Sequence, residues 1–281
     1  MLILPSVLVV AVVALYPLLE SFRLSLTNTR LASAREPRYV GLDNYVDILS
    51  SGSPFWGALQ NTLTFTVASV GLETVFGMVI ALVIHSNFKG RGIVRAAMLV
   101  PWAIPTVVSA SMWDWMYHDV FGIVNDLLVY RLGILDQKVA WLANPTTALP
   151  AIIAVDVWKT TPFMALLLLA GLQLIPGDVY EASTVDGASK WQQFWQITLP
   201  LIKPALLVAL IFRTLDAFRV FDVIYVMKGE ATETISLAVL ARRELIGNSK
   251  LGEGSAIAVI IFLCIAVLVV IYTRLVRVEE Q

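Results

Sequence analysis

The chain has 281 residues, of which 58% are hydrophobic and 15% are charged, and its mean hydropathy is +0.79. Soluble domains are about 45–50% apolar and about 25% charged, so the composition predicts an integral membrane protein. The net charge of −1 provides no basic field and argues against a nucleic-acid partner. The single Cys264 excludes a disulfide framework. His85 and His118 are isolated, so we expect no metal site.

Six apolar runs have about the ~20 residues that a bilayer requires. They predict an all-α fold with six transmembrane helices in one domain, 1–281, at about 2–22, 60–85, 96–117, 147–172, 205–227 and 255–273. The first run has no basic n-region and no small-residue cleavage site, so we expect an uncleaved span rather than a secretory signal. Span two contains one acid, Glu73. Span three contains Pro101 and Pro105, which neighbouring helices can accommodate.

Lys and Arg in the short loops give a weak indication of orientation. They are slightly enriched in the connections on one side of the predicted spans, at 86–95, 174–204 and 274–281. The bias agrees with cytoplasmic N and C termini but is too small to decide the orientation by itself.

A polar segment, 175–200, separates spans four and five. Pro176 and Gly177 are expected to end the preceding helix. Asp178 with Glu181 has the spacing of a capping box, which predicts that a short helix begins at Asp178.

Gly187 is expected to separate this helix from a second one, at a tight reversal where a β-carbon would clash if φ is positive. Ser189 with Gln192 has the spacing of another capping box. We expect Pro200 to end the second helix. One amphipathic face is predicted to pack inward through Trp191, Phe194, Trp195 and Thr198.

Part of this segment carries a family resemblance, through Glu181, Ala182, Asp186, Gly187, Ala188, Ile197, Leu199 and Pro200. Their spacing resembles the EAA loop of ABC importer permeases, although Ser183 stands where a third Ala is commoner. In that family the loop is a coupling helix that docks in a cleft of the cytoplasmic ATPase. The resemblance therefore implies ATPase coupling for Glu181, Ala182, Asp186, Gly187 and Ala188.

Six charged residues fall within spans four and five: Asp156, Lys159, Arg213, Asp216, Arg219 and Asp222. A charge at bilayer depth costs about 3 kcal/mol or more, so these residues should face a bundle interior or a wet cavity. One interpretation is that they are salt bridges joining helices. The other is that they form a polar stripe along a permeation path. Their balanced charges and the neighbouring aromatics suit a neutral polyhydroxy solute better than an anion.

A second resemblance bears on the solute. The stretch Phe218-Arg-Val-Phe-Asp-Val-Ile-Tyr225 resembles a segment of maltose-type sugar permeases. The stretches 157–163 and 212–218 are similar to one of the permeases of trehalose importers. Gly229-Glu-Ala departs from the Gly-Gly-Pro usual in the family. The resemblance implies sugar contacts at Asp156, Lys159, Thr160, Phe163, Phe212, Leu215 and Asp216.

The sequence has no phosphate-binding loop and no nucleophile–base pair, so we expect no enzyme activity and no cofactor bound by this chain. The resemblance implies that a partner ATPase uses ATP and Mg²⁺. It implies a type I ABC importer in the bacterial inner membrane, in contact with membrane lipid. The implied partners are a second permease, two copies of the cytoplasmic ATPase and an extracytoplasmic sugar-binding protein.

Three alternatives remain open. The solute could be a glycerol phosphate or a monosaccharide rather than a disaccharide such as trehalose or another α-glucoside. The chain could be a self-contained secondary transporter or channel, although that leaves the coupling loop unexplained. A membrane scaffold or an intramembrane enzyme is the third alternative, and the enzyme would need a catalytic constellation that the sequence lacks.

Overall fold

The computed structural model describes every residue except 1–8, 10, 32, 34–35 and 280–281. Within these described residues the secondary structure is helical and no strand forms. The contacts divide the chain into two compact units. The first unit contains residues 1–63 and 219–267, and the second contains residues 64–218 and 268–281.

Four described helices are long and apolar enough to cross a membrane, namely Pro54–His85, Pro145–Leu172, Lys190–Lys228 and Leu251–Arg274. A fifth crossing is formed if the bent pair Arg91–Ala103 and Thr106–Met116 is one span. These segments overlap predicted spans two, four, five and six, and the bent pair lies at the place of predicted span three. The first predicted span, 2–22, lies partly outside the described residues.

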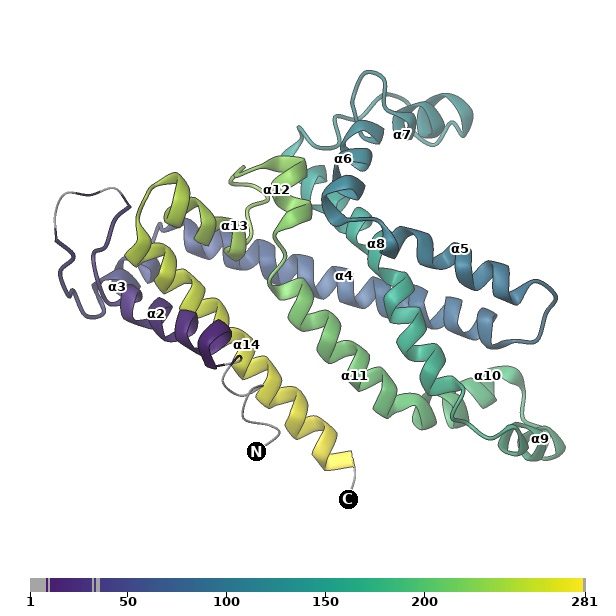
Figure 1. Cartoon of the computed structure of the whole chain (residues 1–281). Coiled ribbons are helices and arrows are strands. Elements are labelled where there is room, and N and C mark those ends of the chain that lie inside the picture. The colour runs from purple at the N-terminus through teal and green to yellow at the C-terminus, as the bar shows by residue number, and fades with distance from the viewer. Residues whose placement is uncertain (1–8, 10, 32, 34–35, 280–281) are drawn as a thin grey trace. The chain divides into compact units, whose positions relative to one another are not determined.

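The second unit contains most of the long helices (Figure 1). Its elements are α4 from Thr64 onward (Pro54–His85), α5 (Arg91–Ala103), α6 (Thr106–Met116), α7 (Ile123–Asn125), η2 (Asp126–Arg131), α8 (Pro145–Leu172), α9 (Gly177–Val185), α10 (Lys190–Gln193), η3 (Phe194–Thr198), α11 (Leu199–Phe218) and the end of α14 (Leu251–Glu279).

The core of this unit lies where α4, α8 and α11 meet. Its buried apolar residues are Met78, Ala81, Ile84, Met164, Leu168, Leu169, Leu172, Ile202 and Ala209. Helix α8 packs against both α5 and α11 (Figure 1). Gly171 permits close packing of α8 on α11, because a Cβ atom there would lie 2.5 Å from the Cβ atom of Ala205. Close approach of this kind is common between membrane helices, whose association depends on packing.

The first unit contains the start of α4 and most of α14, together with η1 (Ala11–Leu15), α2 (Tyr16–Ser25), α3 (Asp43–Leu49), α12 (Asp222–Lys228), α13 (Leu237–Arg242) and η4 (Arg243–Gly247). Phe22 of α2 packs edge-on against Phe262 of α14. The hydroxyl of Thr62 accepts a hydrogen bond from the Leu237 N–H at 2.9 Å, so the start of α4 is joined to α13.

The prediction that span three is one helix is wrong. The chain bends by 90° between α5 and α6, at Ile104 and Pro105. Pro105 lacks an N–H group and restricts the residue before it to an extended conformation, and Ile104 has ψ 134°. Pro101, in contrast, lies inside α5 without breaking it.

The predicted start of span five at about 205 is also wrong. Helix α11 begins at Leu199 and continues from α10 and η3, so Pro200 does not end a helix. The five residues before α11 form a π-helical turn, which changes the backbone hydrogen-bond register immediately ahead of the proline. Span five breaks after Phe218, so Arg219 and Asp222 are not on the same helix as Arg213 and Asp216.

Candidate functional site

A buried ion pair joins α4 to α11. Glu73, on α4, has a side chain with no exposed area, and Arg213, on α11, is almost fully buried. The Arg213 Nε atom donates to Glu73 Oε2 at 2.5 Å, and its second terminal nitrogen donates to Glu73 Oε1 at 2.7 Å. This two-point geometry matches the planar guanidinium to the carboxylate and offsets much of the desolvation cost of both ions.

Arg213 also contacts two further carboxylates. One terminal nitrogen lies 2.6 Å from Asp216 Oδ2 on the next turn of α11. The other lies 3.2 Å from Asp156 Oδ2 on α8. Three helices therefore meet through one guanidinium group. We call Glu73, Asp156, Lys159, Arg213 and Asp216 the charged cluster.

Thr160 and Lys159, both on α8, complete the surroundings of the cluster. The Thr160 hydroxyl lies 2.5 Å from Glu73 Oε1 and 2.5 Å from the Asp156 carbonyl oxygen, so its single proton can be donated to either oxygen. Lys159 is buried, and its Nζ atom donates to the carbonyl oxygen of Trp102 on α5 at 3.4 Å. Asp156 lies one turn before Lys159 on α8, where opposite charges attract each other.

The cluster has a dry end and an open end. Glu73 is completely buried, whereas 60% of the Asp216 side chain is exposed. Phe212, one turn before Asp216, is also exposed, and Leu215 between them is half-buried. On α8, Phe163 is half-buried and stacks on Trp102. The seven residues predicted to contact sugar thus lie in one unit, on two adjacent helices.

Both interpretations of the intramembrane charges describe part of this arrangement. The Glu73–Arg213–Asp156 contacts are salt bridges between helices. The Asp216 carboxylate is held by Arg213 yet remains accessible, so it can accept hydrogen bonds from a solute. Glu73 and Trp102 are absent from the predicted site residues. Glu73 could have been found from the sequence, because it is the one acidic residue in an apolar span. Its partner Arg213 could not, because it lies 140 residues away in the chain.

A second candidate site is the hairpin formed by α9, α10 and η3, which follows the end of α8 (Figure 1). Glu181, Ala182, Asp186 and Gly187 are exposed, and Ala188 is half-buried. Gly187 has φ 80°, a left-handed conformation that glycine adopts readily at a tight reversal. No other atom lies within 4 Å of a Cβ built on Gly187, so the requirement for glycine is conformational rather than steric.

One of the two predicted capping boxes forms. Ser189 and Gln192 make both reciprocal hydrogen bonds of the box at the start of α10. The Asp178–Glu181 box is wrong, because α9 begins at Gly177 and no side chain caps it. Asp178 instead lies in the first turn, where its charge favours the positive end of the helix dipole.

Gln193, which was not among the predicted site residues, joins α10 to α9 by hydrogen bonds. Its buried amide nitrogen lies 2.9 Å from the Ser183 hydroxyl and 2.9 Å from the Thr184 hydroxyl, both on α9. The hydroxyls of Tyr180 and Thr198 are also 2.9 Å apart. Ser183, which stands where the loop usually has an alanine, therefore contributes a hydrogen bond that joins the two helices.

The predicted aromatic packing face is wrong in part. Trp191 is 70% exposed and Trp195 is 50% exposed, and only Phe194 packs against the core. The buried positions are Gln193 and Thr198. Phe194 and Thr198 therefore lie inward as predicted, whereas the two tryptophans do not. The π-helical turn at Phe194–Thr198 has more residues per turn than an α-helix, so a pattern counted at 3.6 residues per turn does not hold across it.

Residues 73–280 match the family described as "Binding-protein-dependent transport system inner membrane component". The trehalose/maltose transport system permease protein MalF of Thermococcus litoralis is 44% identical over 281 residues, covering 99% of this chain and 92% of the relative. The trehalose transport system permease protein SugA of Mycobacterium tuberculosis is 42% identical over 275 residues, covering 98% and 87%.

A crystal structure of a bacterial ABC transporter involved in alginate import contains a chain with the same fold. The TM-score is 0.85 at 24% identity, with 100% of this chain and 95% of that chain covered. This likeness confirms the predicted all-α permease fold. The protein therefore belongs to the inner-membrane components of binding-protein-dependent transport systems, the permease subunits of ABC importers.

Proposed function

We propose that this permease carries a neutral sugar of the trehalose and maltose type. The observation that carries the proposal is the open end of the charged cluster, where Asp216 is fixed by Arg213 but remains accessible. The relatives at 42–44% identity are named for trehalose and maltose transport, which supports the same class of solute.

The charges of the cluster favour an uncharged solute. It contains three carboxylates and two cations, so an anion would meet repulsion from Asp156 and Asp216. The carboxylates can accept hydrogen bonds from sugar hydroxyls, and Lys159 can donate to them. A glycerol phosphate is disfavoured for the same electrostatic reason. Phe163 and Phe212 provide apolar surface beside these polar groups.

Transport would be coupled to ATP hydrolysis through the hairpin. Its exposed residues Glu181, Ala182, Asp186 and Gly187, with Ala188 beside them, would contact a cytoplasmic ATPase that binds ATP and Mg²⁺. The hairpin would then lie in the cytoplasm, with both termini on the same side. The full importer would contain a second permease, two ATPase copies and an extracytoplasmic sugar-binding protein, with this chain as one transmembrane domain in the cell membrane.

An uptake panel with the complete importer in proteoliposomes tests the solute. Labelled trehalose and maltose should accumulate in an ATP-dependent manner, whereas glucose and glycerol 3-phosphate should not. Preferential uptake of the phosphate or of the monosaccharide would contradict the proposal. Uptake by the purified chain without an ATPase would contradict the coupling assigned to the hairpin and favour a secondary transporter.

A further inference from the structure

We propose that Trp102 stacks on the apolar face of a sugar ring, next to the ammonium group of Lys159. This inference rests on the proposed sugar transport and adds a binding position to it. Trp102, Phe163 and Lys159 make up this aromatic subsite.

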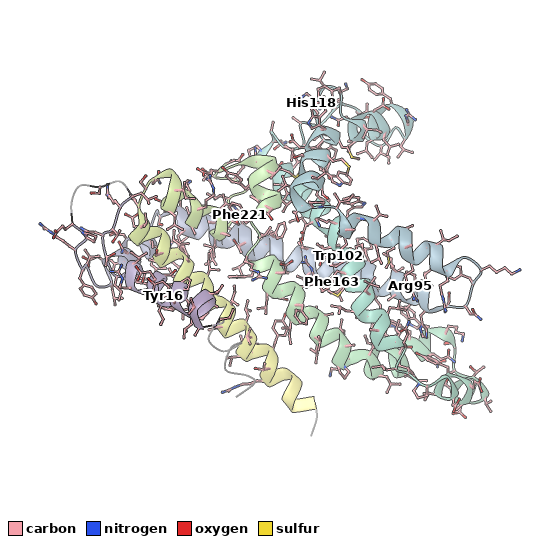
Figure 2. All side chains as sticks on the ribbon, in the orientation of Figure 1. Tyr16, Arg95, Trp102, His118, Phe163 and Phe221 are labelled. Carbon is pink, nitrogen blue, oxygen red and sulfur yellow. The ribbon has the colours of Figure 1, made fainter. Side chains whose placement is uncertain are left out.

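The first observation is the geometry of the aromatic pair. The rings of Trp102 on α5 and Phe163 on α8 are 5.8 Å apart between centroids and inclined by 14°, so they are stacked. Figure 2 labels both residues. Trp102 is nevertheless 46% exposed. Phe163 covers one face of the indole and leaves the opposite face open to another partner. Phe163 therefore holds a flat apolar surface in a fixed orientation.

The second observation is the position of Trp102 along the bent helix pair α5–α6. Tryptophans exposed to lipid headgroups are found at the ends of spans. Trp102 lies instead in the middle of the bent pair α5–α6, two residues before the 90° bend begins at Ile104. Lys159, which contacts its carbonyl oxygen, lies near the middle of α8. Where the bent pair crosses the membrane as one span, Trp102 and Lys159 lie away from the headgroups, which favours a solute path over an interfacial anchor.

The third observation is the incomplete hydrogen bonding of Lys159. Its side chain is more than nine-tenths buried. Within the part of the chain that the structure describes, its one hydrogen bond is the 3.4 Å contact with the Trp102 carbonyl oxygen. An ammonium group has three N–H donors, so two are left for other acceptors. Buried polar groups normally have partners, and hydroxyl oxygens of a solute would supply them.

Together these features suit a pyranose ring. The C–H face of the sugar would lie on the indole, and hydroxyl groups at the ring edge would accept hydrogen bonds from Lys159. An anionic ligand fits less well, because the carboxylates of Asp156 and Asp216 belong to the same cluster and would repel the anion. A lipid chain would leave the remaining Lys159 donors without acceptors.

The first experiment compares Trp102→Ala and Trp102→Phe in the complete importer. Labelled trehalose uptake and ATP hydrolysis stimulated by the loaded binding protein are measured in the same proteoliposomes. Trp102→Ala should lower the trehalose transported per ATP by about tenfold, while stimulated hydrolysis stays within about twofold of wild type. Trp102→Phe should retain at least about half of the transport, because a flat ring remains. Trp115→Ala, which removes an exposed tryptophan from α6, is the matched control.

A wild-type transport ratio in Trp102→Ala would overturn the subsite. So would an equal loss of hydrolysis and transport in both Trp102 variants, because that result indicates a structural role. If the wild-type importer transports neither trehalose nor maltose, the proposed function is wrong. If wild type and Trp102→Ala transport trehalose equally well, only the aromatic subsite is wrong.

A labelling experiment keeps the inference testable if the alanine variant is poorly assembled. Trp102→Cys is made with Cys264→Ser and treated with a charged, membrane-impermeant methanethiosulfonate reagent. The cysteine should react, and trehalose delivered by the binding protein should slow its reaction. A cysteine that does not react with this reagent, or that trehalose does not protect, would overturn the inference.

Discussion

Arg213 on α11 donates two parallel hydrogen bonds to Glu73 on α4, at a position where neither side chain has appreciable exposed surface. The same guanidinium group forms an ion pair with the exposed carboxylate of Asp216. The stability of the protein should therefore depend mainly on the buried Glu73, and contact with the solute mainly on the exposed Asp216.

Glu73→Gln should destabilise the importer. The amide cannot neutralise Arg213, and removing one partner of a buried pair costs about 3–5 kcal/mol. The apparent melting temperature of the purified complex in detergent should fall well below that of wild type. Asp216→Asn is the matched comparison and should have a smaller effect, because more than half of that side chain is already in contact with solvent. Equal losses in the two variants would contradict the division into a dry and an open end.

Asp216→Asn should reduce trehalose uptake by about tenfold to a hundredfold while the complex remains assembled. A hydrogen bond to a charged group is worth about 1.5–3 kcal/mol, and the variant removes the accepting charge. Uptake is measured in proteoliposomes and assembly by size-exclusion chromatography. Asp126→Asn serves as the control, since Asp126 forms an exposed ion pair with Arg131. Normal uptake in Asp216→Asn would exclude this carboxylate from the solute path.

Gly187→Val should weaken ATPase association without preventing membrane insertion. An L-residue with positive φ costs roughly 1–2 kcal/mol, and a β-branched residue costs more, so the reversal after α9 should be distorted. Association is measured by ATPase pull-down. Coupling is measured by substrate-stimulated hydrolysis in nanodiscs. Gly177→Val is the control, because Gly177 has no positive φ and a Cβ there would also meet nothing within 4 Å. Wild-type stimulation in Gly187→Val would exclude a coupling role for this reversal.

Gln193→Ala should loosen the hairpin. The change leaves the Ser183 and Thr184 hydroxyls without the amide between them, at a cost of about 1–3 kcal/mol. Hydrogen exchange over residues 178–187 should become faster, and stimulated ATP hydrolysis should fall. Gln196→Ala, at an exposed position of the same segment, should leave both unchanged. Unchanged exchange in Gln193→Ala would show that the two arms are held by other contacts.

Local patterns in the sequence predicted the features that depend on nearby residues. Apolar runs of bilayer length predicted long apolar helices at spans two, four, five and six, and the spacing of Ser189 and Gln192 predicted a capping box. The tight reversal at Gly187 followed from the position of this glycine between two short helices. These predictions were correct because each depends on a few consecutive residues and on the need to satisfy their own backbone groups.

Other features were decided only by tertiary packing. The Glu73–Arg213 pair joins residues 140 positions apart, and neither spacing nor composition could select that partner among the charges of spans four and five. Trp191 and Trp195 lie at the surface, and the chain bends at Pro105 but not at Pro101. Hydropathy fixed which segments can enter a membrane because it follows from composition alone, whereas the pairing of charges required three helices to come together.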